Sequence, residues 1–516
     1  MAESRIQNTN RNILTNLLNR IVMLLLPFMV RTAVIYTFGA EYLGLNSLFN
    51  AILTMLALAE LGVGSAMVFS MYKPIAENNV AEVSALLNLY RKTYRIIGSF
   101  ILTVGLALVP FLDHLIKGTP PEGMNIRILY VIFLSETVLS YFLFAYKSSI
   151  LAAAQKGYIM GNVGIVLSII QELTKLAVIV YLKDFYIYCM VAIPFIITGN
   201  LITNYVVNKK YPQYKCRGTL DKDILTDIKK RVGGLFLYKI CFVFRDMFGS
   251  VIISAFIGLA VLGQYNNYQY IYGTIAGLLL LLRNSMQASI GNSIAIESES
   301  KNHNDFIRFQ CIYVFISTWC SICLFALYQP FITLWVGKGY LLDNVTMASF
   351  SILLFWGTNC DMCMTYRQAA GLWWQDRFRP IVEAVTNVIL CVLLIKPLGV
   401  LGVTLSSLLC KFFINSVWAS WVLYRFYFKS FKQTFYLKRL LFYLAVYLIT
   451  VTVVGVICYL LPFEGVVQLI CNALVCIIVA PLVMIPFFRI LPESKTALPF
   501  IRNVLRIGIG IKKKSN

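Results

Sequence analysis

About fourteen apolar stretches, each ~20 residues long and therefore able to cross a bilayer as a helix, run through the 516-residue chain. Ionisable residues lie inside several of these stretches. A charged side chain near the middle of a bilayer costs roughly 2.5–3.5 kcal/mol on insertion scales, so it is retained mainly where it faces a wet cavity or a partner. The combination predicts a protein that moves something polar through a membrane, because a simple anchor has no use for buried charges.

The apolar stretches predict an all-α polytopic membrane protein with about 14 transmembrane helices. Only 13% of the residues are charged, against about 25% in soluble domains, which excludes a soluble fold. The expected helices cover residues 13–37, 44–71, 96–116, 126–150, 157–182, 185–207, 233–258, 264–292, 306–334, 346–370, 380–396, 399–427, 436–461 and 464–488.

Basic residues lie mainly in every second gap between the apolar stretches. The gap 208–232 carries eight Lys or Arg residues against three Asp, and the gaps 72–95 and 425–439 are also basic. The gaps 38–43 and 259–263 are short and nearly uncharged. The positive-inside rule places the basic gaps, and both termini with them, in the cytoplasm. The net charge of +22 therefore indicates membrane topology and not nucleic-acid binding.

Short motifs recur along the chain at a nearly constant offset in residue number. The pairs are Gly39/Gly258, Gly44/Gly263 and Arg20/Lys239 at an offset of 219, and Tyr146-Lys147/Tyr366-Arg367 and Gln155/Gln375 at an offset of 220. Six helices separate the copies, so the halves have the same orientation, as in other two-lobed carriers. The expected parts are an N-terminal six-helix lobe (1–207), a basic cytoplasmic linker (208–232), a second six-helix lobe (233–427), two further helices (428–490) and a basic cytoplasmic tail (491–516).

Basic residues outnumber acidic residues within or at the margins of the expected helices. The basic set is Arg20, Arg31, Lys147, Lys175, Lys239, Arg245, Arg283, Arg367 and Lys411, and the acidic set is Glu60, Glu136, Glu172, Asp246, Asp361 and Glu383. An excess of cations in a cavity favours an anionic ligand, and guanidinium groups match phosphate oxygens well. Arg20, Lys239, Arg245 and Arg283 lie deep enough to favour a ligand role.

For the remaining cations a structural role is an equal or better alternative. Arg31, Lys147, Arg367 and Lys411 lie near expected helix ends, where they could reach the interface or form packing ion pairs. Lys175 is expected to pair with Glu172, three residues before it on the same helix. The 13 cysteines are nearly all inside apolar stretches and indicate apolar packing, with no metal site expected.

The N-terminal region resembles the bacterial polysaccharide transporter family, which contains the O-antigen and capsule repeat-unit flippases of the multidrug/oligosaccharidyl-lipid/polysaccharide exporter superfamily. The residues that carry the resemblance are Arg31, Tyr36, Gly39, Glu41-Tyr42-Leu43-Gly44-Leu45, Glu60-Leu61-Gly62 and Tyr72-Lys73-Pro74. The resemblance is specific in residues 1–75 and covers the rest of the chain in helix count, loop sizes and repeat.

This resemblance implies a V-shaped transporter, and not an enzyme, whose lobes alternate between inward- and outward-open states. It implies transfer of an undecaprenyl-diphosphate-linked oligosaccharide from the cytoplasmic to the periplasmic leaflet of the bacterial inner membrane. Such transfer serves O-antigen, capsule or exopolysaccharide synthesis, with a polymerase and glycosyltransferases as partners. No cofactor is implied beyond coupling to a proton or sodium ion.

The expected site follows from the charges and the resemblance together. The candidate substrate-binding residues are Arg20, Arg31, Lys147, Lys239, Arg245, Arg283 and Arg367, and the ion-coupling candidates are Glu60, Asp246 and Asp361. Arg20 and Arg283 match helices 1 and 8, where relatives that flip the peptidoglycan precursor place basic residues. Those relatives also place a basic residue in helix 2. The interior of the expected helix 2 of this chain has no basic residue, which argues against the peptidoglycan precursor as cargo.

Two other classes of protein remain as alternatives. A multidrug or toxin extruder of the same superfamily would favour acidic residues in its cavity, whereas basic residues here outnumber acidic ones by nine to six. A membrane polysaccharide polymerase or glycosyltransferase would need a constellation of polar residues on a sizeable outer loop. The expected outer loops are all short, and the loop 38–43 has Glu41 as its sole charged residue.

Overall fold

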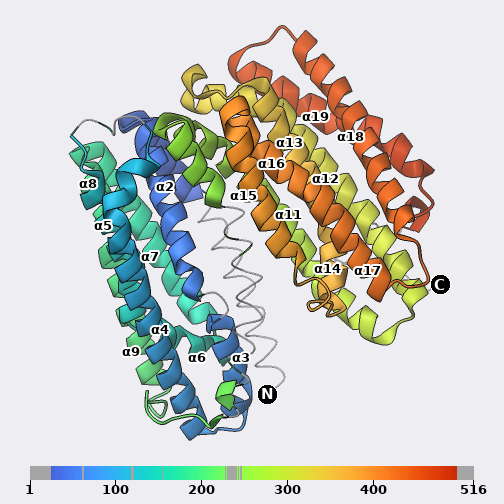
Figure 1. Ribbon diagram of the computed structural model, residues 1–516. Helices are drawn as coiled ribbons and strands as arrows, with labels where there is room; N and C mark the ends of the chain where they lie inside the picture. Colours follow the sequence, from blue (N-terminus) through green and yellow to red (C-terminus); the bar gives the residue numbers. More distant parts are fainter. Residues whose placement is uncertain are drawn as a thin grey trace, which may run out of the picture. The chain divides into compact units, whose positions relative to one another are not determined.

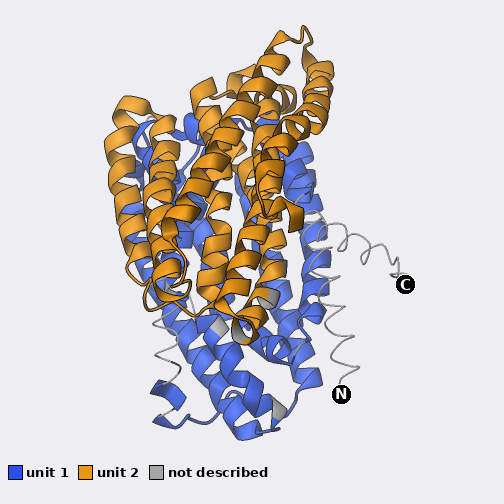
Figure 2. Cartoon of the chain, turned by 90° about the vertical axis from the view of Figure 1, so that its right-hand side faces the viewer, with its two compact units in different colours: residues 1–263 blue, residues 264–516 orange. Residues whose placement is uncertain are grey.

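The computed structural model describes residues 25–496, except for 61–62, 118–120, 122, 155, 223, 227, 229–240, 242 and 244–246. Within this described part the regular structure is entirely helical, as the apolar stretches predict (Figure 1). The chain divides into two compact units, Met1–Gly263 and Gln264–Asn516 (Figure 2).

Unit 1 is a bundle in which α4 packs against α3 and α5, and α9 packs against α5 and α7. Its elements, with η for 3-10 or π segments, are the helix Leu25–Thr37, α2 (Ala40–Leu56), η1 (Ala57–Glu60), α3 (Val63–Ala76), α4 (Val80–Leu108), η2 (Val109–Leu115), α5 (Ile126–Phe142), η3 (Ala145–Lys147), α6 (Ser148–Ala153), α7 (Tyr158–Ala177), η4 (Val178–Leu182), α8 (Phe185–Met190), α9 (Ala192–Lys210) and the helix Met247–Phe256.

Unit 2 is built around α12, which packs against α13 and against the last two helices, α18 and α19. Helix α11 (Leu259–Ile296) begins at the end of unit 1 and continues into unit 2. The other elements are α12 (Glu299–Val336), η5 (Lys338–Tyr340), α13 (Asn344–Asn359), α14 (Asp361–Ala369), α15 (Arg379–Leu398), α16 (Val400–Leu409), η6 (Cys410–Ala419), α17 (Ser420–Phe426), α18 (Gln433–Leu460) and α19 (Gly465–Ile490).

The expected count of about 14 spanning helices is not confirmed. In the described part of the chain, eight helices are long and apolar enough to cross a membrane, or nine if the bent pair α5 and α6 forms one span. These helices make the chain a multi-pass membrane protein. The eight are Val80–Leu115, Tyr158–Leu182, Phe185–Lys210, Glu299–Val336, Arg379–Leu398, Val400–Phe426, Gln433–Leu460 and Gly465–Ile490.

Three expected helices are interrupted, which the apolar pattern does not reveal. The stretch 44–71 divides into α2, η1 and α3; the stretch 126–150 bends by 47° between α5 and α6; and 346–370 divides into α13 and α14. Each interruption coincides with an ionisable residue: Glu60 ends η1, Lys147 ends η3 and Asp361 begins α14. Hydropathy remains high through such a bend, because the flanking side chains are still apolar.

The prediction of a gap between the helices ending at 292 and beginning at 306 is wrong, because α11 and α12 both extend into these residues. Only two residues separate these helices, and the Ser298 side chain caps α12 by accepting a hydrogen bond from the Lys301 backbone N–H. His303 consequently lies in α12 and not in a loop. Its ring stacks on Phe431 at 3.7 Å, and its Nε2 lies 3.2 Å from the Tyr424 hydroxyl.

The starts of α2 and α11 make a reciprocal close contact within residues 1–263. A Cβ atom on Gly44 would lie 2.2 Å from the Leu259 carbonyl oxygen, and one on Gly263 would lie 2.2 Å from the Ala40 carbonyl oxygen. Ala40 and Leu259 are related by the same offset as the two glycines, so each contact is the copy of the other under the predicted repeat. Glycine is the residue that permits such close approach of two backbones.

Candidate functional site

Unit 2 holds an ion pair between two residues that the sequence singles out. Arg283 on α11 donates from a terminal nitrogen to Asp361 Oδ1 at 3.0 Å, and the two side chains are 18% and 24% exposed. The Tyr313 hydroxyl on α12 lies 3.0 Å from Asp361 Oδ2. Asp361 is the first residue of α14, so the interruption of the helix turns its carboxylate toward α11 and α12.

A second cation lies beside this pair. Lys411, in the π-helical segment η6, donates from Nζ to the Tyr272 hydroxyl at 3.2 Å. A Cβ atom on Gly357, one helical turn before Asp361, would lie 2.7 Å from the same Nζ. The group formed by Arg283, Asp361, Tyr313 and Lys411, which we call the Arg283 cluster, thus contains two cations and one carboxylate.

Unit 1 holds a different group of polar side chains around Glu60. The hydroxyl of Tyr94 on α4 donates to Glu60 Oε1, and the hydroxyl of Tyr141 on α5 donates to Glu60 Oε2 at 2.6 Å. The Tyr90 hydroxyl donates to that of Tyr94 at 2.9 Å. All three tyrosines are buried. We call these four residues the Glu60 cluster.

Lys147 lies in unit 1 with neutral hydrogen-bond acceptors. Its Nζ donates to Asn204 Oδ1 at 2.5 Å and to Asn208 Oδ1 at 2.7 Å, both on α9. The side chain is 9% exposed, and no carboxylate in the described part of the chain forms an ion pair with it. Charge-assisted hydrogen bonds to amide oxygens reduce the cost of burying the ammonium group but leave its charge uncompensated.

Arg367, which occupies the repeat-related position to Lys147, belongs to a buried network of ion pairs. It forms an ion pair with Asp376, which also pairs with Arg379 at 3.0 Å. Arg379 in turn pairs with Glu383 at 3.0 Å and donates to the Asn415 side chain. Both arginines and Asp376 are 1% exposed. In this conformation the structure therefore buries Arg367 in the protein interior.

The other predicted residues are distributed as follows. Arg31 is half-buried on the helix Leu25–Thr37. Arg20, Lys239, Arg245 and Asp246 lie outside the described residues. The prediction that Lys175 pairs with Glu172 is confirmed, with Nζ and Oε1 3.0 Å apart.

The structure brings Arg283 and Asp361 together and leaves Glu60 and Lys147 in separate groups. The residues that sequence reasoning missed are the tyrosines, because a tyrosine in an apolar stretch gives no hydropathy signal. Groups of three or more His, Cys, Asp or Glu side chains that could hold a metal ion are absent from the described part.

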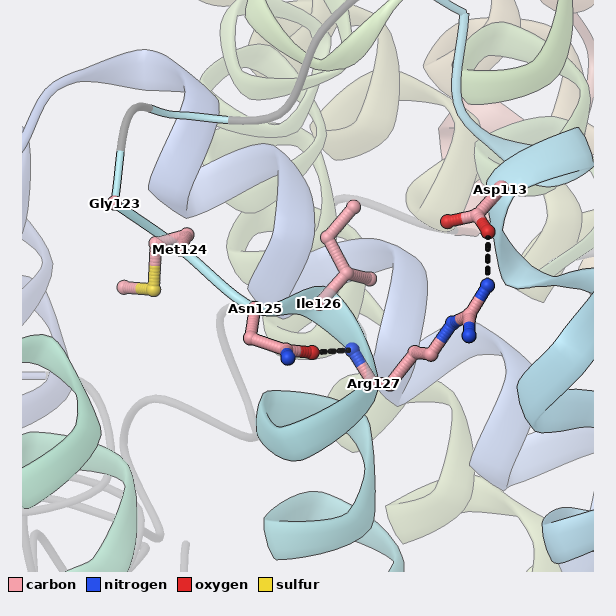
Figure 3. Close-up of a pocket in the computed structure, with 6 residues that line it drawn as sticks. All are labelled: Asp113, Gly123, Met124, Asn125, Ile126 and Arg127. Atoms are coloured by element: carbon pink, nitrogen blue, oxygen red, sulfur yellow. Dashed lines mark hydrogen bonds and ion pairs between the residues drawn. The ribbon is translucent and has the colours of Figure 1, made fainter.

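A surface pocket of about 480 Å³ lies where η2 and α5 approach each other (Figure 3). Arg127 donates to Asp113 at 2.7 Å across it, and the Asn125 side chain accepts a hydrogen bond from the Arg127 backbone N–H at 3.1 Å. Both charged side chains are more than half exposed. The pocket contains none of the predicted site residues, so the Glu60 cluster in unit 1 and the Arg283 cluster in unit 2 remain the two candidate sites.

Comparison with solved structures identifies the fold. The lipid II flippase MurJ in an inward closed conformation matches with a TM-score of 0.67 and 16% identity, over 94% of this chain and 99% of that chain. An inward-facing multidrug resistance MATE transporter of the MOP superfamily matches with a TM-score of 0.61 and 14% identity, over 77% of this chain and 93% of that one.

A MATE transporter from Vibrio cholerae matches with a TM-score of 0.56 and 16% identity, over 84% of this chain and 100% of that one. No protein-family profile and no curated protein sequence matches the chain. These three proteins are membrane transporters and not enzymes. At sequence identities this low, it is the structural similarity that establishes a shared fold.

Proposed function

We propose that this chain, which has the fold of the MOP-superfamily transporters, is a flippase for undecaprenyl-diphosphate-linked oligosaccharide repeat units. It carries them from the cytoplasmic to the periplasmic leaflet by alternating access, for O-antigen, capsule or exopolysaccharide synthesis. The protein lies in the bacterial inner membrane with both termini in the cytoplasm, and a polymerase and glycosyltransferases act beside it. The MurJ structure supports a lipid-linked cargo, because that protein is a lipid II flippase.

The observation that carries the proposal is the composition of the Arg283 cluster. The Arg283 side chain is 18% exposed, and its ion pair with Asp361 joins one terminal nitrogen to one carboxylate oxygen. A diphosphate presents several anionic oxygens and can bind the guanidinium fork of Arg283 in place of Asp361, which contacts it through a single oxygen. Asp361 would hold Arg283 in place in the absence of cargo and release it when the diphosphate binds.

The remaining candidates have supporting roles in this proposal. Arg20, Arg31, Lys147, Lys239 and Arg245 supply further cationic contacts to the diphosphate along its path. Arg367 holds the end of α14 through its buried partner Asp376 and reaches cargo only in another conformation. Glu60, Asp246 and Asp361 are the candidates for coupling transport to a proton or a sodium ion.

Replacing Arg283 by alanine is the direct test. A charge-assisted hydrogen bond contributes about 1.5–3 kcal/mol, so transfer should slow by roughly ten- to a hundred-fold. The measurement is transfer of a labelled undecaprenyl-diphosphate oligosaccharide across proteoliposomes, together with surface polysaccharide in cells. Arg283→Lys should retain part of the rate, because it keeps the charge and loses the guanidinium fork.

The matched control is Arg127→Ala, which also removes an arginine from an ion pair with an aspartate but at the exposed pocket of unit 1. It should leave transfer unchanged. The contradicting result would be normal transfer and full-length polymer in Arg283→Ala, at an equal amount of protein in the membrane. Arg283 would then not bind the cargo, and the argument for an anionic cargo would fail.

A multidrug extruder remains the second candidate, favoured by the MATE structures and by the carboxylate of Glu60. Such a protein should confer resistance to cationic drugs on overexpression. We expect no change in resistance, because the partly exposed guanidinium group of Arg283 repels organic cations.

A further inference from the structure

The turn between α14 and α15 in unit 2 exposes large aromatic side chains around an arginine (Figure 1). Trp374 is 72% exposed and Phe378 is 55% exposed, and Arg377 between them in the sequence is exposed as well. The central carbon of the Arg377 guanidinium group lies 3.8 Å from the centre of the Trp374 ring and 4.6 Å from the centre of the Phe378 ring. We call these three residues the Trp374 cluster. Large apolar rings that the chain itself leaves uncovered indicate a partner.

Buried neighbours fasten this turn to the rest of unit 2. Asp376, the residue before Arg377, is 1% exposed, and its carboxylate forms ion pairs with Arg367 and Arg379. Arg377 donates from a terminal nitrogen to the Trp374 carbonyl oxygen at 2.8 Å, which closes the turn. The exposed side chains are therefore presented by an anchored turn, on the side opposite to the buried carboxylate.

The predicted repeat indicates that the turn itself does not require these side chains. Under the offset of 220, Trp374 corresponds to Ala154 and Arg377 corresponds to Gly157. Both lie in unit 1 between α6 and α7, where the chain makes the corresponding turn with small residues. The Trp374 cluster therefore serves a purpose other than closing the turn.

One face of α15 continues the exposed apolar surface that begins at Trp374 and Phe378. Its side chains recur at helical spacing and are 38–63% exposed: Val382, Val385, Ile389 and Leu393. The opposite face of α15 is polar and packs on α16 and η6, through Asn387 to Ser406 and through Glu383 to Asn415. A stripe of Val, Ile and Leu on a helix long enough to span the membrane suits lipid and not a water-filled cavity. The Trp374 cluster thus lies at the end of a lipid-facing stripe, where tryptophan meets the headgroups.

Arg377 supplies a positive charge at this depth. Among the residues that the structure describes, no acidic side chain forms an ion pair with it. A guanidinium group has five N–H donors, so most remain for phosphate oxygens after the bond to the Trp374 carbonyl. We propose that the Trp374 cluster binds the headgroup of an anionic phospholipid, with the phosphate on Arg377 and the rings of Trp374 and Phe378 among the upper parts of the acyl chains.

The charge and the place of the cluster favour this occupant. An anionic phospholipid such as phosphatidylglycerol carries one net negative charge, which one guanidinium group matches, whereas a lipid diphosphate would leave part of its charge unmatched here. The basic gaps predict that this end of α15 is cytoplasmic, and the cytoplasmic leaflet attracts basic residues through its anionic lipids.

Quenching of Trp374 fluorescence by brominated lipids tests the site in the full-length protein in nanodiscs. Trp374→Ala copies the alanine of unit 1 and should fold, so its emission subtracted from that of the wild type gives the signal of Trp374. Brominated phosphatidylglycerol should quench this signal at a mole fraction about fivefold lower than brominated phosphatidylcholine, because one basic residue at an anionic lipid surface favours binding by about that factor. Equal quenching by the two lipids, or quenching by neither, would overturn the proposal.

Variants of Arg377 separate this site from a general attraction of the protein to anionic lipid. Arg377→Gln, measured with and without Trp374→Ala, should lose the preference for phosphatidylglycerol, and Arg377→Lys should keep part of it. The matched control Lys429→Gln removes another exposed cation on the same predicted side of the membrane and should keep the preference in full. A preference that persists in Arg377→Gln, or that is lost equally in Lys429→Gln, would contradict a site at Arg377.

A competition experiment distinguishes the phospholipid from the cargo of the proposed function. Undecaprenyl diphosphate without bromine, added at the mole fraction of the brominated phosphatidylglycerol, should not relieve the quenching of Trp374. Relief would assign the Trp374 cluster to the lipid diphosphate and overturn the phospholipid site. The quenching experiments need no transport, so they hold or fail independently of the flippase assignment.

Discussion

Replacing Arg379 by alanine should destabilise the protein by about 3–5 kcal/mol, the largest effect that we expect from a single substitution. Its guanidinium group lies 3.0 Å from both oxygens of Asp376 and 3.0 Å from Glu383, with 1% of its side chain exposed. Removal of Arg379 takes an ion-pair partner from each of two buried acids, Asp376 and Glu383. Thermal unfolding in detergent, followed by intrinsic fluorescence, measures the loss.

Two further variants test whether the destabilisation depends on the burial of the charge. Lys301→Ala breaks an ion pair with Glu297 whose side chains are 55% and 38% exposed, and should cost only about 0–1 kcal/mol. The double variant Arg379→Met with Glu383→Gln removes one charge of each sign and should recover much of the stability. Equal destabilisation by Arg379→Ala and Lys301→Ala would show that the network is not buried in the membrane-embedded protein.

Replacing Gly44 or Gly263 by alanine should destabilise the close contact between the starts of α2 and α11. The new Cβ atom would lie 2.2 Å from a backbone carbonyl oxygen that no rotamer change can move, so the two helix starts must separate. Forcing an extra methyl group into close packing costs about 1–3 kcal/mol. The thermal midpoint of either variant should therefore fall, and the two should fall by similar amounts because the contacts are copies of each other.

The same substitution at Gly273 provides the control. Gly273 lies inside α11, with nothing within 4 Å of the position of its Cβ atom. Gly273→Ala should raise stability by about 0.5–1 kcal/mol, because alanine favours the helix over the unfolded chain. A rise in the midpoint for Gly44→Ala or Gly263→Ala as well would mean that the two helix starts are not in backbone contact.

Local pattern was sufficient to predict the class of fold. Apolar stretches of sufficient length predict membrane helices whatever their neighbours are, because in lipid the backbone must satisfy its own hydrogen bonds. The pairing of Glu172 with Lys175 was equally predictable, since residues three apart share a helix face. The repeat offset also led to Gly44 and Gly263, whose reciprocal contacts the structure contains.

Interruptions of helices and long-range pairings could not be predicted in the same way. Nothing in the apolar stretch 126–150 indicates the bend that places Lys147 against α9, since every flanking residue is compatible with a straight helix. The residues 293–305 were expected to be a gap because they are polar. Polarity indicates exposure to water but not the end of a helix, so α11 and α12 continue there.

The sequence by itself determined that this protein crosses a membrane as a helical bundle and retains charges inside it, because hydropathy and charge are properties of each segment alone. Only the tertiary structure decided what those charges do. It paired Arg283 with Asp361 from a distant part of the chain and enclosed Arg367 in a buried network of ion pairs. It also surrounded Glu60 with tyrosines from two other helices. The environment of a buried charge depends on which helices pack around it, and that packing is set by contacts between segments far apart in the chain.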